Sequence, residues 1–167
     1  AGQFYTPRCV VELLVRIIEP YSGTVYDPCC GSGGMFVHSA KAIMNSSANI
    51  SEVKFIGQES NPKTWRLARK NMLIHGLEHD LGGHAEDSFA HPLHPVSCAD
   101  FCLANPPFNM SRWTPSDLTL LDEIMPYGVP PDSCANYAWI QHILSRLNDR
   151  GRAAVLFANG SLDAVVG

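Results

Sequence analysis

The sequence predicts a single α/β domain in which parallel strands alternate with helices that cover both faces of the sheet. Two observations lead to this prediction. Short apolar runs alternate along the chain with segments whose apolar residues recur at helical spacing, which is typical of βαβ units. With 167 residues, of which 46% are hydrophobic, the chain can also bury one sizeable core, so we expect residues 1–167 to form one domain.

Composition narrows the class of protein. The net charge is −4, whereas a protein that binds DNA by itself usually carries a basic excess, so any positive surface must be local or come from a partner. The six cysteines include no C-x-x-C pair, so we expect reduced thiols rather than disulfides or a zinc site. No apolar run reaches the roughly 18 residues of a membrane span, and the N-terminus does not resemble a signal peptide. We therefore expect a cytoplasmic protein without a membrane partner.

The first predicted helix begins at Thr6-Pro7. Thr6 is expected to be the N-cap, and Pro7 suits the first helical position. Apolar residues then recur at helical spacing until Pro20 stops the pattern. These residues are Val10, Leu13, Leu14, Ile17 and Ile18.

Two strands flank the next helix. TVYDP at 24–28 is typical of a short buried strand, and the glycine-rich CGSGG at 30–34 follows it. We expect a helix over residues 35–44, and VKFIGQE at 53–59 predicts a second strand.

The following segment predicts a helix and two more strands. Asn61-Pro62 starts the helix by the same combination of cap and proline, and Gly76 ends it. HAEDSF at 84–89 is expected to be a short third strand with its exit loop, and ADFCLAN at 99–105 a fourth strand.

The last third contains a long connection. Residues 109–134 lack clear periodicity, and loops of that length inside compact domains are usually functional or disordered. YAWIQHILSRL at 137–147 predicts an amphipathic helix, and RAAVLFANG at 152–160 a fifth strand. We expect Tyr137 and Trp139 of that helix to lie in the core.

The unusual polar and glycine-rich motifs all fall at the carboxyl ends of predicted strands. They are Asp27–Gly34, Glu59, Asp87–Ser88 and Asn105–Phe108. In open parallel sheets, ligands bind beyond the carboxyl ends of the strands, so this coincidence predicts one shared site.

The glycine loop and the two strand-end acids favour an adenosine-bearing cofactor. DPCCGSGG matches neither the phosphate-binding loop, because no lysine follows, nor the dinucleotide pattern, because Phe36 stands where its last glycine is needed. Its glycines still allow close approach of the backbone to a ligand. Glu59 is placed to accept both hydroxyls of a ribose, and Asp87 to meet the amino group of an adenine. A cofactor without a pyrophosphate, such as S-adenosylmethionine, fits better than NAD or ATP.

The stretch FCLANPPFN at 101–109 predicts a site for a flat amine. The side-chain oxygen of Asn105 and the carbonyl of Pro106, which has no N–H, can each accept a hydrogen bond from one amino group. Phe108 offers a face on which a base can stack. Such an arrangement suits methyl transfer to the N6 of an adenine that is flipped out of duplex DNA.

With these motifs in place, the sequence resembles the catalytic core of the modification (methyltransferase) subunit of type I restriction–modification systems, a family of N6-adenine DNA methyltransferases. The resemblance covers essentially all of the chain. It rests on GQFYTPR (2–8), YDPCCGSGGMF (26–36), GQESNP (57–62), LANPPFN (103–109), YGVPP (127–131), NYAWIQH (136–142) and LFANGS (156–161). The resemblance implies a Rossmann-like methyltransferase sheet and S-adenosyl-L-methionine as cofactor, with no metal.

The resemblance also implies residue roles. The segment that embraces the methionine end of the cofactor is Gln3, Phe4, Tyr5, Thr6, Pro7 and Arg8. The methionine and backbone region of the cofactor is contacted by Asp27, Gly31, Ser32, Gly33 and Gly34. Glu59 takes the ribose, and Asp87 with Ser88 the adenine of the cofactor. The target adenine is held by Asn105, Pro106, Pro107 and Phe108.

The family implies partners as well as a substrate. The substrate is DNA, and a specificity subunit reads the target sequence, together with a second modification subunit and a restriction subunit in the larger complex. If the specificity subunit recognises the DNA, this chain does not need a basic surface of its own, which would account for its acidic net charge. The N-terminal helical domain, the C-terminal elements and the later strands of the family's sheet find no match in these 167 residues, so we expect a catalytic fragment.

Two alternative functions stay open from the sequence. N-P-P-aromatic motifs also suit methylation of a glutamine amide in protein or of exocyclic amines in RNA. A fragment could also bind the cofactor or a partner without turnover.

Some conspicuous side chains have simpler explanations. His91 and His94 are expected in a polar loop rather than in a metal site, and Arg66, Arg69 and Lys70 on a solvated helix face. For Trp113 and Tyr127 in the long loop, contact of either one with DNA or a partner remains open.

Overall fold

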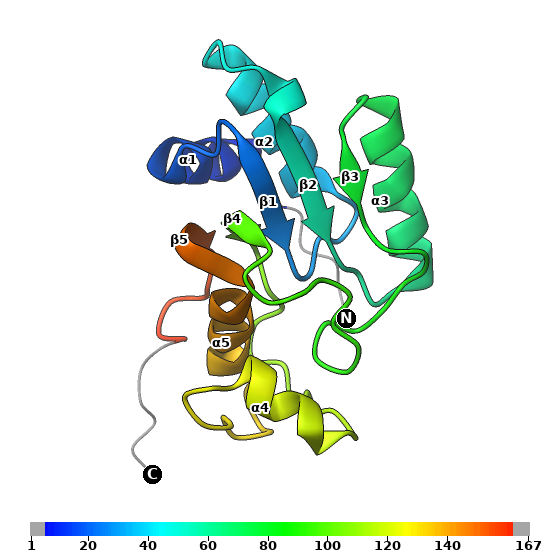
Figure 1. Ribbon diagram of the computed structural model, residues 1–167, viewed down its shortest axis with the longest axis vertical. Helices are drawn as coiled ribbons and strands as arrows, with labels where there is room; N and C mark the ends of the chain where they lie inside the picture. Colours follow the sequence, from blue (N-terminus) through cyan, green and yellow to red (C-terminus); the bar gives the residue numbers. More distant parts are fainter. Residues whose placement is uncertain (1–5, 162–167) are drawn as a thin grey trace.

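A five-stranded parallel sheet forms the centre of the molecule (Figure 1). The computed structural model describes residues 6–161, apart from the side chains of residues 120 and 123. Its strands are β1 (Gly23–Asp27), β2 (Val53–Gly57), β3 (His79–Asp80), β4 (Ala99–Ala104) and β5 (Leu147–Val155), in the order β3-β2-β1-β4-β5. The order reverses direction between β1 and β4, and such switch points are where open α/β sheets bind ligands.

Helices cover both faces of this sheet, as predicted. They are α1 (Arg8–Ile18), α2 (Gly34–Asn45), α3 (Pro62–Ile74), α4 (Leu121–Ile124) and α5 (Asn136–Arg146), with short 3-10 turns η1 (Ile50–Glu52) and η2 (Leu118–Leu120). Because successive strand residues point to opposite faces, Val25 and Phe55 join the core under α1, α2 and α3, whereas Tyr26 and Ile56 pack on the α5 side.

Helices α2 and α3 follow the sequence prediction closely. Asn61 caps α3, since its Oδ1 accepts hydrogen bonds from the backbone N–H groups of Lys63 (2.9 Å) and Thr64 (3.2 Å). Gly76 follows the helix with a φ of 62°, the left-handed conformation that a glycine adopts without strain. The basic side chains of α3 are exposed, and the Arg69 guanidinium lies 5.0 Å from the centre of the Trp65 ring.

Helix α1 departs from the prediction at its start and in its buried face. The helix begins at Arg8, and Pro7 occupies the N-cap position without a side-chain cap, so the predicted cap at Thr6 is wrong. Leu13 and Ile17 are 56% and 61% exposed, contrary to the predicted face. The buried face is rotated by one position because a second apolar stripe packs on α2 and the sheet. It consists of Val11, Leu14, Val15 and Ile18.

The predicted third strand at 84–89 is wrong. The third strand is the two-residue β3, which pairs with Phe55 and Ile56 of β2. Residues 84–89 instead form a loop and turn, because the Asp87 carboxylate accepts hydrogen bonds from the N–H groups of Phe89 (2.8 Å) and Ala90 (3.0 Å). Hydrogen bonds that an aspartate side chain accepts from the following backbone N–H groups favour a turn and so compete with strand pairing.

The fifth strand begins five residues earlier than predicted and ends at Val155. Leu147 pairs with Ala99, and after an irregularity in register Arg152 pairs with Phe101. The strand therefore starts directly after α5, and residues 156–160 of the predicted strand lie beyond it.

The long connection is packed rather than open. It contains η2 and α4, and Trp113 is 4% exposed with its ring 5.1 Å from that of Phe89. Trp139 joins this cluster as predicted, but Tyr137 is 47% exposed, so the prediction that it lies in the core is wrong. Of the two aromatic residues left open, Tyr127 is the exposed one.

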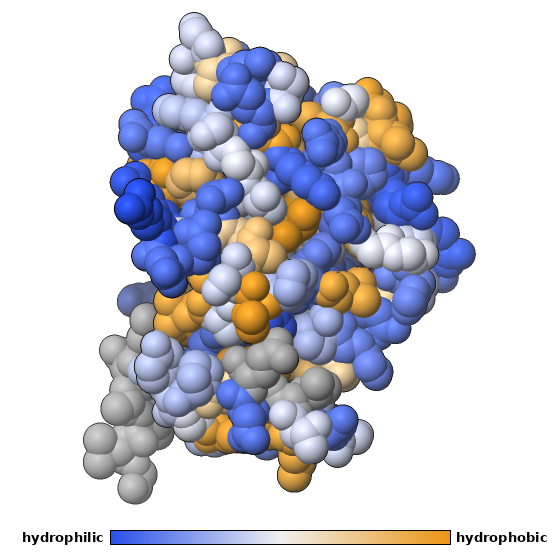
Figure 2. Space-filling view, in the orientation of Figure 1, coloured by the Kyte–Doolittle hydropathy of each residue, from blue (hydrophilic) through white to orange (hydrophobic). Residues whose placement is uncertain are grey.

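The surface mixes polar and apolar residues. On the face drawn in Figure 2, hydrophobic residues are scattered among hydrophilic ones rather than gathered in one broad patch. Within the part of the chain that the structure describes, no helix is long and apolar enough to cross a membrane.

Candidate functional site

The candidate site lies at the carboxyl ends of β1, β2 and β4. The parallel register places Asp27 at the end of β1 beside Gly57 at the end of β2. Gly31 and Gly33 in the loop after β1 have φ values of 56° and 78°, which glycine adopts without strain. This loop is tied down by the backbone N–H of Cys30, which donates to the Gln58 carbonyl (2.9 Å), and by Asn71 Nδ2, which donates to the Ser32 carbonyl (2.8 Å).

Asp27 is a buried carboxylate. Only 2% of its surface is exposed, and its Oδ1 accepts one hydrogen bond from the backbone N–H of Cys29 (2.9 Å). Burial raises the pKa of Asp27 from 3.8 to about 7, the Cys29 hydrogen bond opposes the rise, and the nearby Glu59 carboxylate adds to it. No ion pair to Asp27 occurs within residues 6–161, so a bound cation would find an uncompensated acid here.

Glu59 lies two residues beyond the end of β2, because the strand ends at Gly57 and not at Glu59 as predicted. Its Oε1 accepts a hydrogen bond from the backbone N–H of Asn61 (2.7 Å), which holds the side chain beside the start of α3. Its carbonyl accepts one from the N–H of Glu86 (3.1 Å), which brings the loop at 84–90 to the same edge.

Asp87 and Ser88 reach this edge through that loop rather than from a strand. The predicted strand-end placement of Asp87 is therefore wrong, and its exposed carboxylate caps the turn at 87–90. Ser88 is 4% exposed and its hydroxyl donates to the Pro28 carbonyl. The pair thus lies against the loop that follows Asp27.

Asn105 follows β4, the neighbour of β1. Its Nδ2 donates a hydrogen bond to Thr6 Oγ1 (2.9 Å), which fixes the orientation of the amide. Within residues 6–161 no hydrogen bond to its Oδ1 is described, so this oxygen can accept one from a ligand. Pro106 is buried, whereas Pro107 and Phe108 are exposed. Arg8, in contrast, pairs with Glu12 on the outside of α1 (2.7 Å), and Gln3, Phe4 and Tyr5 lie outside the described residues.

Two buried amides at this edge were not anticipated from the sequence. Gln58 is fully buried, and it bonds the loop after β3 through the His91 carbonyl (3.1 Å) and the Leu93 N–H (2.8 Å). Asn136 bonds Asn109, directly after the NPPF motif. A polar residue at the end of a strand or the start of a helix is the only local signal for either, because their partners are distant in sequence.

His91 and His94 occupy different environments. His91 is exposed and faces Glu86 (3.1 Å), whereas His94 is buried and its Nε2 lies 3.1 Å from the Gly57 carbonyl. The prediction of a polar loop thus holds for His91 only. Within residues 6–161 there is no group of three or more residues able to hold a metal ion.

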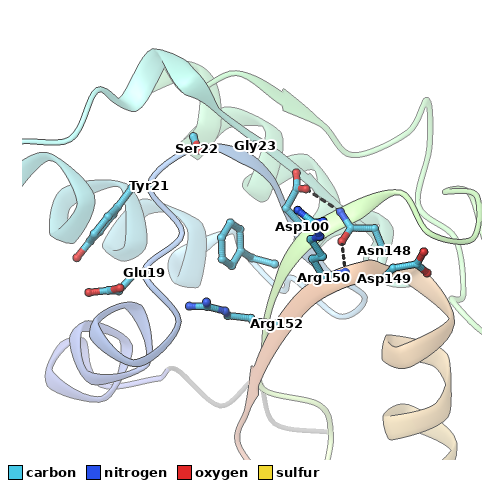
Figure 3. A pocket seen from close by; sticks show the side chains of 10 residues that line it. Glu19, Tyr21, Ser22, Gly23, Asp100, Asn148, Asp149, Arg150 and Arg152 are labelled. Carbon is cyan, nitrogen blue, oxygen red and sulfur yellow. Dashed lines mark hydrogen bonds between the residues drawn. The ribbon is translucent and has the colours of Figure 1, made fainter.

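A separate cavity of about 700 Å³ lies at the other ends of the strands, away from the candidate site (Figure 3). Its lining comes from the amino ends of β1 and β4 and from β5. Asp100 there accepts hydrogen bonds from the Thr24 N–H (2.8 Å) and from Asn148 (2.7 Å). These bonds join the starts of three strands, so the acid serves the sheet rather than the candidate site.

Comparisons with known proteins place the chain. The profile of the N-6 DNA methylase family matches residues 1–165. The chain is 45% identical over 164 residues to the type I restriction enzyme HindI methylase subunit of Haemophilus influenzae, covering 98% of this chain and 37% of that protein. It is 36% identical over 168 residues to the MjaIX methylase subunit of Methanocaldococcus jannaschii, covering 98% and 30%.

Solved structures share the fold. The type I restriction–modification methyltransferase subunit from Streptococcus thermophilus superposes with a TM-score of 0.79 at 29% identity, covering 96% of this chain and 36% of that one. A putative class I S-adenosylmethionine-dependent methyltransferase from Listeria monocytogenes gives a TM-score of 0.76 at 14% identity, covering 99% and 50%. The second likeness concerns the fold alone.

The fold is that of the Rossmann-like S-adenosylmethionine-dependent methyltransferases. Within this class, the chain belongs to the N-6 DNA methylase family. It spans about a third of the length of the relatives that it matches.

The described residues fit S-adenosyl-L-methionine, the cofactor that this family and fold imply. The buried, uncompensated carboxylate of Asp27 suits the cationic amino group of the methionine moiety. The glycine loop lets the backbone approach a ligand, and Glu59 supplies carboxylate oxygens beside the next strand.

Proposed function

We propose that residues 1–167 form the catalytic core of the modification subunit of a type I restriction–modification system. This subunit methylates the N6 of adenine in DNA. The observation that carries the proposal is the Asn105–Thr6 hydrogen bond. Because the amide nitrogen is used by Thr6, the amide oxygen is left as an acceptor at the end of β4, next to the strand that carries Asp27. Membership of the N-6 DNA methylase family supports the same activity.

Asn105 and Pro106 activate the target amine. The Asn105 side-chain oxygen and the Pro106 carbonyl each accept a hydrogen bond from the adenine amino group, which draws its nitrogen toward tetrahedral geometry. Phe108, which is 39% exposed, stacks on the flipped base, and Pro107 stiffens the turn between them. When bound, S-adenosylmethionine would supply an electrophilic methyl group, and Asn105, Pro106 and Phe108 would hold N6 in line with it.

The proposed cofactor contacts follow the carboxyl edge of the sheet. Asp27 and the loop Gly31, Ser32, Gly33 and Gly34 hold the methionine region, Glu59 the ribose, and Asp87 with Ser88 the adenine. Gln3 to Arg8 complete the methionine end. The Thr6 contact with Asn105 supports this role for the segment, whereas the outward Arg8–Glu12 pair gives no support for Arg8.

The proposed partners follow from the relatives, which are subunits of restriction enzymes. A specificity subunit selects the target sequence, a second modification subunit completes the methyltransferase, and a restriction subunit joins the larger complex in the cytoplasm. The net charge of −4 supports this division of labour, because phosphate binding requires positive surface from elsewhere.

Transfer of label from methyl-labelled cofactor tests the proposal. The full-length subunit with its specificity partner is expected to label DNA. Asn105→Ala is expected to lower this transfer by at least about 100-fold while cofactor affinity changes little, because the lost acceptor acts on the target base. Asn45→Ala on the exposed end of α2 is the control and is expected to keep full activity.

Three results would contradict the proposal. Unchanged DNA labelling by Asn105→Ala would remove the assigned role of this residue. Label appearing in protein or RNA instead of DNA would favour the alternative acceptors, and absence of cofactor binding would favour an assembly role.

A further inference from the structure

The loop that carries the NPPF motif is fastened at both ends by side-chain amides. At its start, Asn105 bonds Thr6. At its end, the backbone N–H of Asn109 donates to Asn136 Oδ1 (3.1 Å), and Asn136 Nδ2 donates to Asn109 Oδ1 (3.0 Å). The second pair is reciprocal and joins residues 27 positions apart.

Asn136 is built into this position. It is the first residue of α5, is 1% exposed, and uses its second amide hydrogen to bond the Ser161 carbonyl (3.1 Å). Its oxygen and both of its amide hydrogens are therefore engaged. A backbone hydrogen bond lies next to this pair, because the Ala135 N–H donates to the Met110 carbonyl (2.8 Å).

The pair also holds a residue whose backbone is left-handed. Asn109 is exposed and has a φ of 52°, in the left-handed region that few residues other than glycine, asparagine and aspartate adopt. The side chain of Asn109 accepts from Asn136 while its backbone donates to the same partner, so the left-handed turn is held by two bonds.

Apolar packing alone does not fix Phe108. Its side chain is 39% exposed and belongs to none of the hydrophobic clusters that residues 6–161 form. Its placement therefore depends on buried Pro106 on one side and on the Asn109–Asn136 pair on the other.

We propose that Asn136 is a positioning residue for adenine methylation. Through Asn109 it sets the position of Phe108 and of the acceptors at Asn105 and Pro106, and through Ser161 it couples them to the segment after β5. This inference rests on the proposed function. It adds a residue that acts without touching either cofactor or base.

Gln141 provides a matched control on the same helix. It is also a buried amide, and it anchors a different loop by accepting from the Tyr127 N–H (2.9 Å) and donating to the Gly128 carbonyl (2.7 Å). If Asn136 merely stabilises the fold, loss of either amide should have similar effects on activity.

The test uses the full-length subunit with its specificity partner and two duplexes. Unmodified target DNA gives kcat. The same DNA with 2-aminopurine in place of the target adenine lacks the 6-amino group that is methylated, and it reports unstacking by a rise in fluorescence. Asn136→Ala is expected to lower kcat by about 10- to 100-fold and to weaken the fluorescence rise, because misplacement of a positioned group costs rates of that order. Cofactor affinity is expected to stay within about threefold. Gln141→Ala is expected to change neither kcat nor fluorescence by more than about threefold.

Asn109→Gly guards against failure of Asn136→Ala to fold. Glycine keeps the left-handed backbone at this exposed site but removes the side-chain half of the pair. It is expected to reproduce the loss in kcat, and the double variant Asn109→Gly with Asn136→Ala should be no worse than the poorer single variant.

Two outcomes would overturn the inference. One is wild-type kcat and base unstacking in Asn109→Gly. The other is equal losses in the Asn136→Ala and Gln141→Ala variants at equal melting temperatures. A wild-type complex that unstacks the base and binds cofactor but methylates no DNA would instead contradict the proposed function.

Discussion

Asp27 combines burial, one backbone hydrogen bond and a pKa raised to about 7. Because its folded pKa lies above the unfolded value of 3.8, the stabilisation that the neutral acid provides is complete below about pH 4 and is lost as pH rises toward 7. A cation bound at Asp27 would reverse this cost by favouring the ionised form. The residue is thus better suited to a complex with a cationic ligand than to the empty protein.

Cofactor affinity should therefore depend on pH near neutrality. We expect the affinity for S-adenosylmethionine to fall as pH drops below about 7, approaching tenfold per pH unit, because a proton competes with the cofactor's amino group. Calorimetry between pH 5.5 and 8.5 measures this directly. Asp27→Asn should bind weakly with a flat profile, whereas exposed Glu52→Gln should behave as wild type. A wild-type profile that is flat across pH 7 would contradict the role of Asp27.

At the scale of elements, the close contact of β2 with β1 positions this carboxylate. Gly57 lies beside Asp27 in register, and a Cβ at Gly57 would lie 2.8 Å from the Asp27 carbonyl and 3.1 Å from the Phe36 ring. The first distance is too short and involves backbone, so relief requires β1 to move.

Gly57→Ala should consequently weaken the site. We expect destabilisation by roughly 1–3 kcal/mol, as for overpacked cores, and a loss of cofactor affinity of at least about tenfold. Urea unfolding and calorimetry report the two effects. Gly83→Ala is the control, because a Cβ there meets nothing within 4 Å, and it should be close to neutral. Wild-type affinity in Gly57→Ala would show that this contact does not set the position of Asp27.

Local patterns predicted most of the elements that build the site. β1, β2, β4 and α3 were found within a few residues, because apolar runs, glycine punctuation and the Asn61 cap act locally. β3 was missed because two residues become a strand only through pairing with β2. The start of β5 was missed because its register is irregular beside β4.

The sequence predicted that the site residues lie at the ends of strands, but it did not predict the hydrogen bonds between them. Asp27 ends β1, and Glu59 and Asn105 lie within two residues of the ends of β2 and β4. The Thr6–Asn105 bond spans 99 residues and the Asn109–Asn136 pair spans 27, so no local spacing reveals either. The helix-cap interpretation of Thr6 failed for the same reason, because its hydroxyl serves a distant residue.

At the scale of the whole molecule, the strand order brings the site residues together, whereas the net charge disfavours DNA binding by the chain alone. The reversal between β1 and β4 brings Asp27 and Asn105 to neighbouring strands. The chain nevertheless carries a net charge of −4, which opposes binding to a polyanion.

DNA affinity should accordingly depend on a partner. We expect the modification subunit alone to bind duplex DNA more weakly than about 10 μM at 150 mM salt, within the range of non-specific binding, and the complex with its specificity subunit to bind at least about 100-fold more tightly. Fluorescence anisotropy with labelled duplex measures both. Equally tight, sequence-specific binding by the subunit alone would show that recognition is not delegated.

The most direct measurement is the identity of the methylated nucleoside. The full-length subunit and its specificity partner are incubated with S-adenosylmethionine and target DNA. Digestion of the DNA and mass spectrometry should then reveal N6-methyl-2′-deoxyadenosine. Asn105→Ala should abolish this product, and Asn45→Ala should not. Methylation of another base, or undiminished N6 methylation by Asn105→Ala, would contradict the proposal that the end of β4 holds the target adenine.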